Sequence, residues 1–202
     1  MPLFLQGLLL GLSIAAPVGP IGILCIRRTL ILGRLTGLVS GLGAATADGL
    51  YGCVAGFGLT LVTQFLVAQT LWLQVIGGLF LIYLGAKIFV SRPAEEAAAI
   101  APQSTLLGAY VSTLALTLTN PATILSFVAI FAGLGLARGD RSYVDSGVLV
   151  LGVFVGSALW WCLLSWSVNL FRAKFNPQQL RWLNRVSGLI MVAFGVIALG
   201  WR

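Results

Sequence analysis

The sequence alternates between long apolar stretches and short segments that carry polar and basic residues. The apolar stretches span residues 3–26, 35–62, 71–90, 106–136, 147–170 and 183–201. A helix needs about 20 apolar residues to cross a hydrocarbon core of about 30 Å, so each stretch is long enough. A backbone in lipid has no water to bond, and a helix satisfies its own hydrogen bonds. The pattern therefore predicts an all-α integral membrane protein with six transmembrane helices.

The composition supports a membrane environment. Of the 202 residues, 59% are hydrophobic and only 8% are charged, whereas about 25% charged residues are usual in soluble domains. The net charge of +7 comes from short clusters of Lys and Arg between the apolar stretches, and these form no continuous basic face. Such clusters are typical of membrane topology signals and not of nucleic-acid binding. We expect membrane lipid and no nucleic acid among the partners.

The Lys and Arg residues are distributed unequally between the two sides of the predicted membrane. Nine lie after the first, third and fifth stretches or at the end of one of them: Arg27, Arg28, Arg34, Lys87, Arg92, Arg172, Lys174, Arg181 and Arg185. The other three are Arg138, Arg141 and Arg202. Because cytoplasmic loops carry the excess of Lys and Arg, we predict a multi-pass protein of a bacterial-type inner (plasma) membrane with both termini outside. The first stretch has no basic region before it, so we interpret it as a retained helix and not a cleaved signal peptide.

Identical residues recur in the same order in the two halves of the chain. At a spacing of 101 residues Gly7 and Pro20 recur as Gly108 and Pro121, and at 110 residues Gly78 and Gly85 recur as Gly188 and Gly195. Each half holds three apolar stretches, and an odd number inverts the second copy relative to the first. We predict two inverted three-helix repeats, residues 1–91 and 105–202, joined by a cytoplasmic linker at 92–104.

Two proline-containing segments interrupt the first and fourth stretches. They are Ala15-Ala16-Pro17-Val18-Gly19-Pro20 and Thr117-Leu118-Thr119-Asn120-Pro121. Proline removes a backbone donor and clashes with the preceding turn, so both helices should break here. Pro20 and Pro121 then begin new half-helices, with Gly19 and Asn120 as the N-cap residues.

Both new half-helices would begin near the membrane midplane, where inverted repeats build their substrate sites. Each helix N-terminus carries about half a positive charge and unpaired N–H groups, which suit an anionic group such as a carboxylate. Thr119, Thr123 and Ser126 add a polar stripe at helical spacing. The predicted substrate-binding residues are Pro17, Gly19, Pro20, Thr119, Asn120, Pro121, Thr123 and Ser126. The alternative is that the prolines are ordinary kinks of membrane helices.

Asp48 is the only acid well inside an apolar stretch. Burying its charge in a membrane costs at least about 2.5 kcal/mol, and intramembrane acids are functional by default. It shares a helix face with the small residues Gly41, Ala45 and Gly52, where another helix can pack closely. We expect Asp48 to carry a coupling proton or to bind a substrate ammonium, and Tyr51 could donate a hydrogen bond to it. The alternative is a protonated Asp48 that bonds a backbone carbonyl.

The remaining candidate residues give weaker signals. Three cysteines lie inside apolar stretches at spacings that fit neither a metal site nor a redox pair, and we interpret them as small buried hydrophobes: Cys25, Cys53 and Cys162. Three tryptophans of the fifth stretch could line a pathway or simply pack: Trp160, Trp161 and Trp166. No His occurs, and no pairing of a nucleophile with a base is visible, so we expect no enzyme, no metal and no cofactor.

The order of these motifs resembles the LysE/RhtB family of amino-acid exporters. In the first half the resemblance rests on Ala-Pro-Val-Gly-Pro at 16–20, the basic segment after it and Ala-Thr-Ala-Asp at 45–48. In the second half it rests on Leu-Thr-Asn-Pro at 118–121 and Gly-Ser-Ala-Leu-Trp at 156–160. The resemblance covers nearly the whole chain and implies export of amino acids or related small molecules driven by the proton motive force. The positions that match the family are Gly19, Pro20, Asp48, Asn120 and Pro121.

The leading hypothesis is a proton antiporter that exports an amino acid, with the carboxylate at the two half-helix N-termini and the amine near Asp48. A cationic amino acid would want more than one carboxylate, and Ser126 stands where some lysine exporters of the family place an acid. A metal-cation exporter is an alternative, opposed by the lack of His and of further intramembrane acids, and a passive channel is another. Small residues such as Gly37, Gly41 and Ala45 could pack within the protomer or across a homodimer.

Overall fold

The computed structural model describes residues 2–17, 19–57, 64–65, 68–91, 102–120, 123–128 and 142–200. Within these ranges the chain is helical and contains no strand. The helices are α1 (Leu3–Ala15), α2 (Pro20–Leu32), α3 (Arg34–Gly56), α5 (Thr70–Val90), α7 (Pro102–Leu118), α9 (Tyr143–Phe171), the 3-10 turn η1 (Arg172–Lys174) and α10 (Pro177–Gly200). A further helical segment covers residues 123–128.

The long helices are apolar enough to cross a membrane. Among the described residues α3, α5, α9 and α10 each qualify alone, and α1 and α2 together qualify as one broken span with an angle of 82° between its halves. The break falls at the predicted Pro17–Pro20 segment. α7 is shorter, and the predicted fourth stretch continues beyond residue 128, outside the described residues. The chain is thus an all-α, multi-pass membrane protein.

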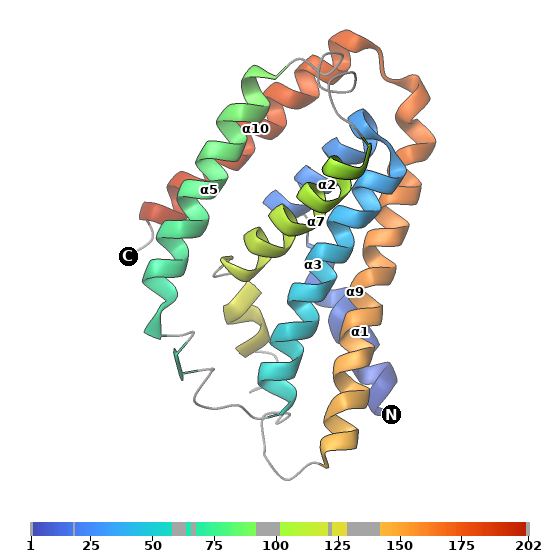
Figure 1. The fold of residues 1–202 in the computed structure, drawn as a ribbon, viewed down its shortest axis with the longest axis vertical. Helices are drawn as coiled ribbons and strands as arrows, with labels where there is room; N and C mark the ends of the chain where they lie inside the picture. Colours follow the sequence, from blue (N-terminus) through green and yellow to red (C-terminus); the bar gives the residue numbers. More distant parts are fainter. Residues whose placement is uncertain are drawn as a thin grey trace.

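Figure 1 shows α5 and α10 side by side along one edge of the molecule, apart from the bundle of α1, α3, α7 and α9. α5 and α10 approach until their backbones touch, at two pairs of glycines. A Cβ on Gly85 would lie 2.7 Å from the carbonyl oxygen of Gly188, and one on Gly195 would lie 2.7 Å from that of Gly78. Glycine at these positions is therefore required by the close approach of the two helices.

The bundle is held together in the same way. A Cβ on Gly7 or Gly11 of α1 would overlap backbone atoms of α9, and one on Gly43 of α3 would overlap the carbonyl oxygen of Tyr110 in α7. α3 also packs against α9, so it lies at the centre of the bundle between α7 and α9. This position surrounds the middle of α3 with protein and keeps it away from lipid.

The small-residue face of α3 is used within the protomer. Gly37 meets the side chain of Thr29 in α2, Gly41 meets the ring of Trp161 in α9, and Ala45 is fully buried. The prediction that another helix packs on the face of Asp48 is confirmed, and the packing helix is α9. A homodimer would need a different surface.

The prediction that Arg27 and Arg28 lie in a loop is wrong. α2 continues to Leu32, and the two side chains are only 3% and 9% exposed. Arg28 Nη1 donates hydrogen bonds to Ser40 Oγ at 3.0 Å and to Thr113 Oγ1 at 2.9 Å. A guanidinium with several acceptors can be buried inside a protein, which a count of charges between apolar stretches does not anticipate.

Arg27 connects the bundle side of the molecule to the α5–α10 pair. Its Nε donates to Asn184 Oδ1 of α10 at 2.8 Å, and its Nη2 donates to Ser91 Oγ at the end of α5 at 3.1 Å. Asn184 in turn donates to the carbonyl oxygen of Ser91 at 3.1 Å. These bonds tie α2 to α5 and α10 at one end of the pair.

The turn between α2 and α3 is a single residue, Gly33, whose φ of 102° is accessible to glycine and rare for other residues. Arg172 donates from Nε to the carbonyl oxygen of Leu30 at 3.0 Å and from Nη2 to that of Ile31 at 3.3 Å. A cation with donors at the C-terminus of a helix satisfies carbonyls that lack intrahelical partners. This contact fixes where α2 ends.

The cysteines differ in environment. Cys25 is fully buried and belongs to the core, Cys53 is half-buried and Cys162 is exposed on α9. The expectation that all three are buried therefore holds for Cys25 and is wrong for Cys162.

Candidate functional site

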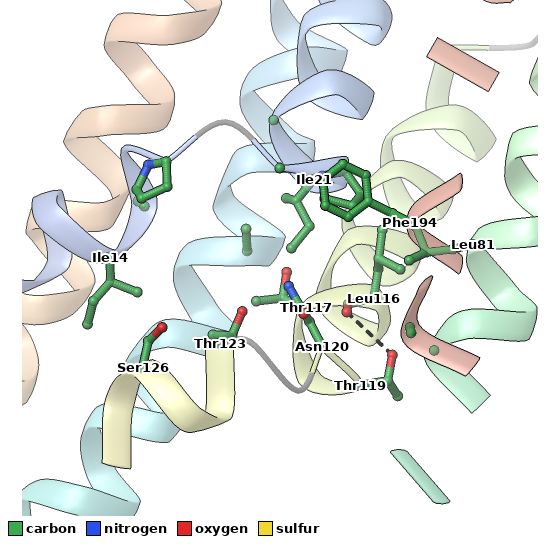
Figure 2. Close-up of a pocket in the computed structure, with 18 of the residues that line it drawn as sticks. Ile14, Ile21, Leu81, Leu116, Thr117, Thr119, Asn120, Thr123, Ser126 and Phe194 are labelled. Atoms are coloured by element: carbon green, nitrogen blue, oxygen red, sulfur yellow. Dashed lines mark hydrogen bonds between the residues drawn. The ribbon is translucent and has the colours of Figure 1, made fainter. Parts of the chain in front are cut away.

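A cavity of about 520 Å³ lies where the first helix is broken. The ends of α1 and α7, the start of α2, the middle of α3 and the facing sides of α5 and α10 form its walls. It also receives residues of the segment 123–128 (Figure 2). The cavity therefore opens between the bundle and the α5–α10 pair.

The cavity brings most of the predicted site residues together. Those that line it are Pro17, Gly19, Pro20, Asp48, Thr119, Asn120, Thr123 and Ser126. The remaining predicted residue, Pro121, lies outside the described residues. Residues from segments about 100 positions apart in the sequence thus share one cavity.

Two helices begin at this cavity. Pro20 is the first residue of α2 after the extended Gly19, and the N–H of Ile23 donates to the carbonyl oxygen of Gly19 at 3.1 Å. In the second half the N–H of Ile124 donates to the carbonyl oxygen of Asn120 at 3.3 Å. The N–H groups of α2 before Ile23 precede the hydrogen-bond ladder and are available to other acceptors, whereas the N–H of Thr123 also donates to the Asn120 carbonyl, at 3.1 Å.

Asp48 lies in α3, 3% exposed, and is one of the cavity-lining residues. Its Oδ2 accepts a hydrogen bond of 2.6 Å from Ser157 Oγ, and Ser157 Oγ accepts one of 3.2 Å from Trp161 Nε1. Trp161 itself lines the cavity and is 4% exposed. A chain of donors therefore leads from the indole in the cavity wall to the carboxyl group.

The suggested hydrogen bond between Tyr51 and Asp48 is wrong. The Tyr51 hydroxyl donates to the carbonyl oxygen of Leu118 at 2.6 Å. Leu118 is the last residue of α7, where carbonyl groups lack intrahelical donors and accept from side chains instead. Tyr51 thus supports the end of α7.

The predicted polar stripe does not run along one continuous helix. α7 ends at Leu118, and the Thr119 hydroxyl donates back to the carbonyl oxygen of Ala115 at 2.9 Å. Thr123 and Ser126 belong to the next helical segment. The prediction of one helix face was wrong for Thr119 because the helix stops before Asn120, yet all three side chains line the cavity.

The wall made by α5 and α10 was not predicted from the sequence. That wall consists of Gln74, Gly77, Gly78, Leu81, Phe194, Ile197 and Ala198. Its apolar members look like any lipid-facing residue of a membrane helix. Gln74 is the one position with a visible signal, since it is a polar side chain within an apolar stretch.

Comparison with known proteins identifies the family. The family model described as LysE type translocator matches residues 12–200. The "Putative amino acid efflux protein YcgF" of Bacillus subtilis (strain 168) is 30% identical over 200 residues, covering 96% of this chain and 94% of its own length. The "Lysine exporter LysE" of Corynebacterium glutamicum is 23% identical over 97% of each chain.

The "Uncharacterized membrane protein YahN" of Escherichia coli (strain K12) is 28% identical over 85% of this chain and 77% of its own length. No solved structure matches. The family match spans both helix breaks and the helix of Asp48. This chain belongs to the LysE type translocators, a family of membrane transporters and not of enzymes.

Proposed function

We propose that the chain is a secondary active exporter of amino acids or related small metabolites that binds its substrate in the cavity between the broken helices. The observation that carries the proposal is that two helix N-termini and one buried acid line the same cavity. Its volume of about 520 Å³ lies within the usual range for small-molecule sites. The amino-acid efflux named for the Bacillus relative agrees with this use.

The charges of the cavity match a zwitterion. The N-termini of α2 and of segment 123–128 each carry about half a positive charge and would receive the substrate carboxylate. Asp48 would receive the ammonium group, or a proton when the substrate leaves. Such an arrangement compensates both charges of the substrate inside the cavity.

Helix contacts support the proposed inverted repeats, residues 1–91 and 105–202, with the linker at 92–104. The spacing of 110 residues pairs Gly78 with Gly188 and Gly85 with Gly195, and the contacts join Gly78 to Gly195 and Gly85 to Gly188. A two-fold axis exchanges these two contacts. The same axis relates the packing of α1 on α9 to that of α7 on α3.

In this proposal the α5–α10 pair rocks against the bundle to expose the cavity to each side of the membrane in turn. Among the described helices, few contacts join the two parts besides those of α2 with α10 and of α5 with α7. Removing the buried Arg27 and Arg28 from the cytoplasmic side leaves seven basic residues there against three on the other side. That distribution still favours an inner-membrane protein with both termini outside.

Proteoliposomes preloaded with a mixture of amino acids test the proposal. We expect loss of one or a few amino acids that depends on an imposed pH gradient, read by mass spectrometry. Equal loss with and without the gradient would indicate a passive channel. Retention of every amino acid by folded protein would remove this substrate class and make metal cations the next cargo to test.

A further inference from the structure

We infer that the exported amino acid is neutral and carries an apolar side chain, which lies against α5 and α10. The inference rests on the proposed function, since it specifies the substrate of the same cavity. Two features of the cavity lining carry it: the positions of the polar groups and the number of ionisable residues.

The side of the cavity formed by α5 and α10 is mostly apolar. Figure 2 shows Thr119, Thr123 and Ser126 along one side, at the end of α7 and in the segment after it. Leu81 of α5 and Phe194 of α10 line the other part of the wall with hydrocarbon side chains, and Thr119 packs on Gly77 of α5. Of the seven residues that α5 and α10 contribute to the lining, only Gln74 has a polar side chain. An amino acid bound with its charged groups on the polar side would turn its side chain toward this apolar wall.

Charge excludes the acidic and basic amino acids. Asp48 is the only ionisable residue among the described residues that line the cavity, and Ser157 and Trp161 direct donors toward it. The ammonium of the substrate uses this one carboxyl group. A lysine or glutamate side chain would bring a further charge against Leu81 and Phe194, where no counter-charge is described, and an uncompensated buried charge strongly opposes binding.

Among neutral amino acids, the apolar wall of α5 and α10 favours substrates with apolar side chains over those with polar ones. A hydroxyl or amide placed against Leu81, Phe194 and Ile197 would lose its hydrogen bonds to water without finding acceptors there. Each methylene buried on such a wall improves binding by about fourfold. A leucine-sized side chain should therefore be preferred over that of alanine by more than about tenfold.

Counterflow in proteoliposomes tests the inference on the full-length chain, because exchange needs no proton gradient. Vesicles are loaded with one unlabelled amino acid, and entry of the same amino acid in radiolabelled form is followed. Leucine, methionine or phenylalanine inside should support exchange at least about tenfold faster than lysine or glutamate, with alanine far below leucine. Exchange with lysine or glutamate as fast as with leucine would overturn the inference and leave the exporter intact. Absence of exchange with any amino acid would contradict the exporter itself.

A charge placed on the apolar wall gives the second test. Leu81→Asp should raise lysine exchange relative to leucine exchange at least about tenfold, and the nearly isosteric Leu81→Asn should not. Phe194→Ala, which adds no charge, should narrow the preference for leucine over alanine. If folded Leu81→Asp protein kept the selectivity of the wild type, or if Phe194→Ala kept the full preference for leucine over alanine, the substrate side chain would not lie against α5 and α10. Either result would overturn the inference.

Discussion

Replacing Asp48 by Asn removes the charge of the cavity while keeping its shape. The amide oxygen of the new side chain can still accept the hydrogen bond that Ser157 donates to Asp48 at 2.6 Å. A neutral hydrogen bond contributes about 1 kcal/mol and one to a charged group about 1.5–3 kcal/mol, so the folded protein should lose no more than about 2 kcal/mol. We therefore expect Asp48→Asn to yield a folded protein that elutes as the wild type does in detergent.

Transport should change far more than stability. Loss of a charged hydrogen bond to the substrate ammonium, worth about 1.5–3 kcal/mol, weakens binding by about 10- to 150-fold. The amide also cannot take up and release a proton as a carboxyl group does, so efflux should no longer respond to an imposed pH gradient. Initial efflux rates from proteoliposomes, with and without the gradient, measure both effects.

The control is Asp145→Asn, because Asp145 is an exposed acid in the first turn of α9. It should leave efflux within about twofold of the wild type, since no described contact joins it to the cavity. Gradient-driven efflux by Asp48→Asn at the wild-type rate would refute the coupling role of Asp48.

Three further predictions concern the helix break and the helix contacts. Pro20→Ala and Pro121→Ala should reduce initial efflux rates to a similar degree if the two breaks form one site. Gly85→Ala places a methyl group 2.7 Å from a carbonyl oxygen of α10, and should lower the free energy of unfolding by about 1–3 kcal/mol. Arg27→Lys cannot reproduce bonds to Asn184 and Ser91 at once, and should speed hydrogen exchange at the end of α5.

Each of these variants has a matched comparison in the chain. For Gly85 it is Gly108→Ala, because a Cβ at Gly108 meets nothing within 4 Å; equal thermal stabilities would contradict the packing argument. For Arg27 it is Arg181→Lys at an exposed position of α10. If hydrogen exchange at the end of α5 were the same in both variants as in the wild type, the role of Arg27 in joining α2 to α5 and α10 would be contradicted. Impaired efflux from only one proline variant would contradict a symmetric site.

Local sequence signals were sufficient to predict where the first helix breaks and which acid lies at the candidate site. The break before Pro20 could be predicted because proline and glycine act on their own turn of helix, and α2 begins there. Asp48 could be placed at a candidate functional position because an acid inside an apolar stretch is costly wherever the chain folds. Both inferences use only residues that are neighbours in the sequence.

Partners that are distant in the sequence could not be predicted. Ser157 meets Asp48 across 109 positions because α9 packs on α3, and nothing in its own helix indicates this. The burial of Arg27 depends on Asn184, 157 positions away, so a count of charges placed it in a loop. The α5–α10 wall escaped prediction because an apolar residue that faces a cavity looks the same in sequence as one that faces lipid.

Both broken helices should bind the same substrate, and protection of introduced cysteines from a thiol reagent shows whether they do. Cys162, the exposed native thiol, is first replaced by Ala, and Ile21→Cys and Ser126→Cys are then labelled separately with a thiol reagent. These positions line the cavity from the two halves of the chain. We predict that one transported amino acid slows labelling at both positions over the same concentration range. Labelling that this amino acid leaves unchanged at either position would contradict a shared site.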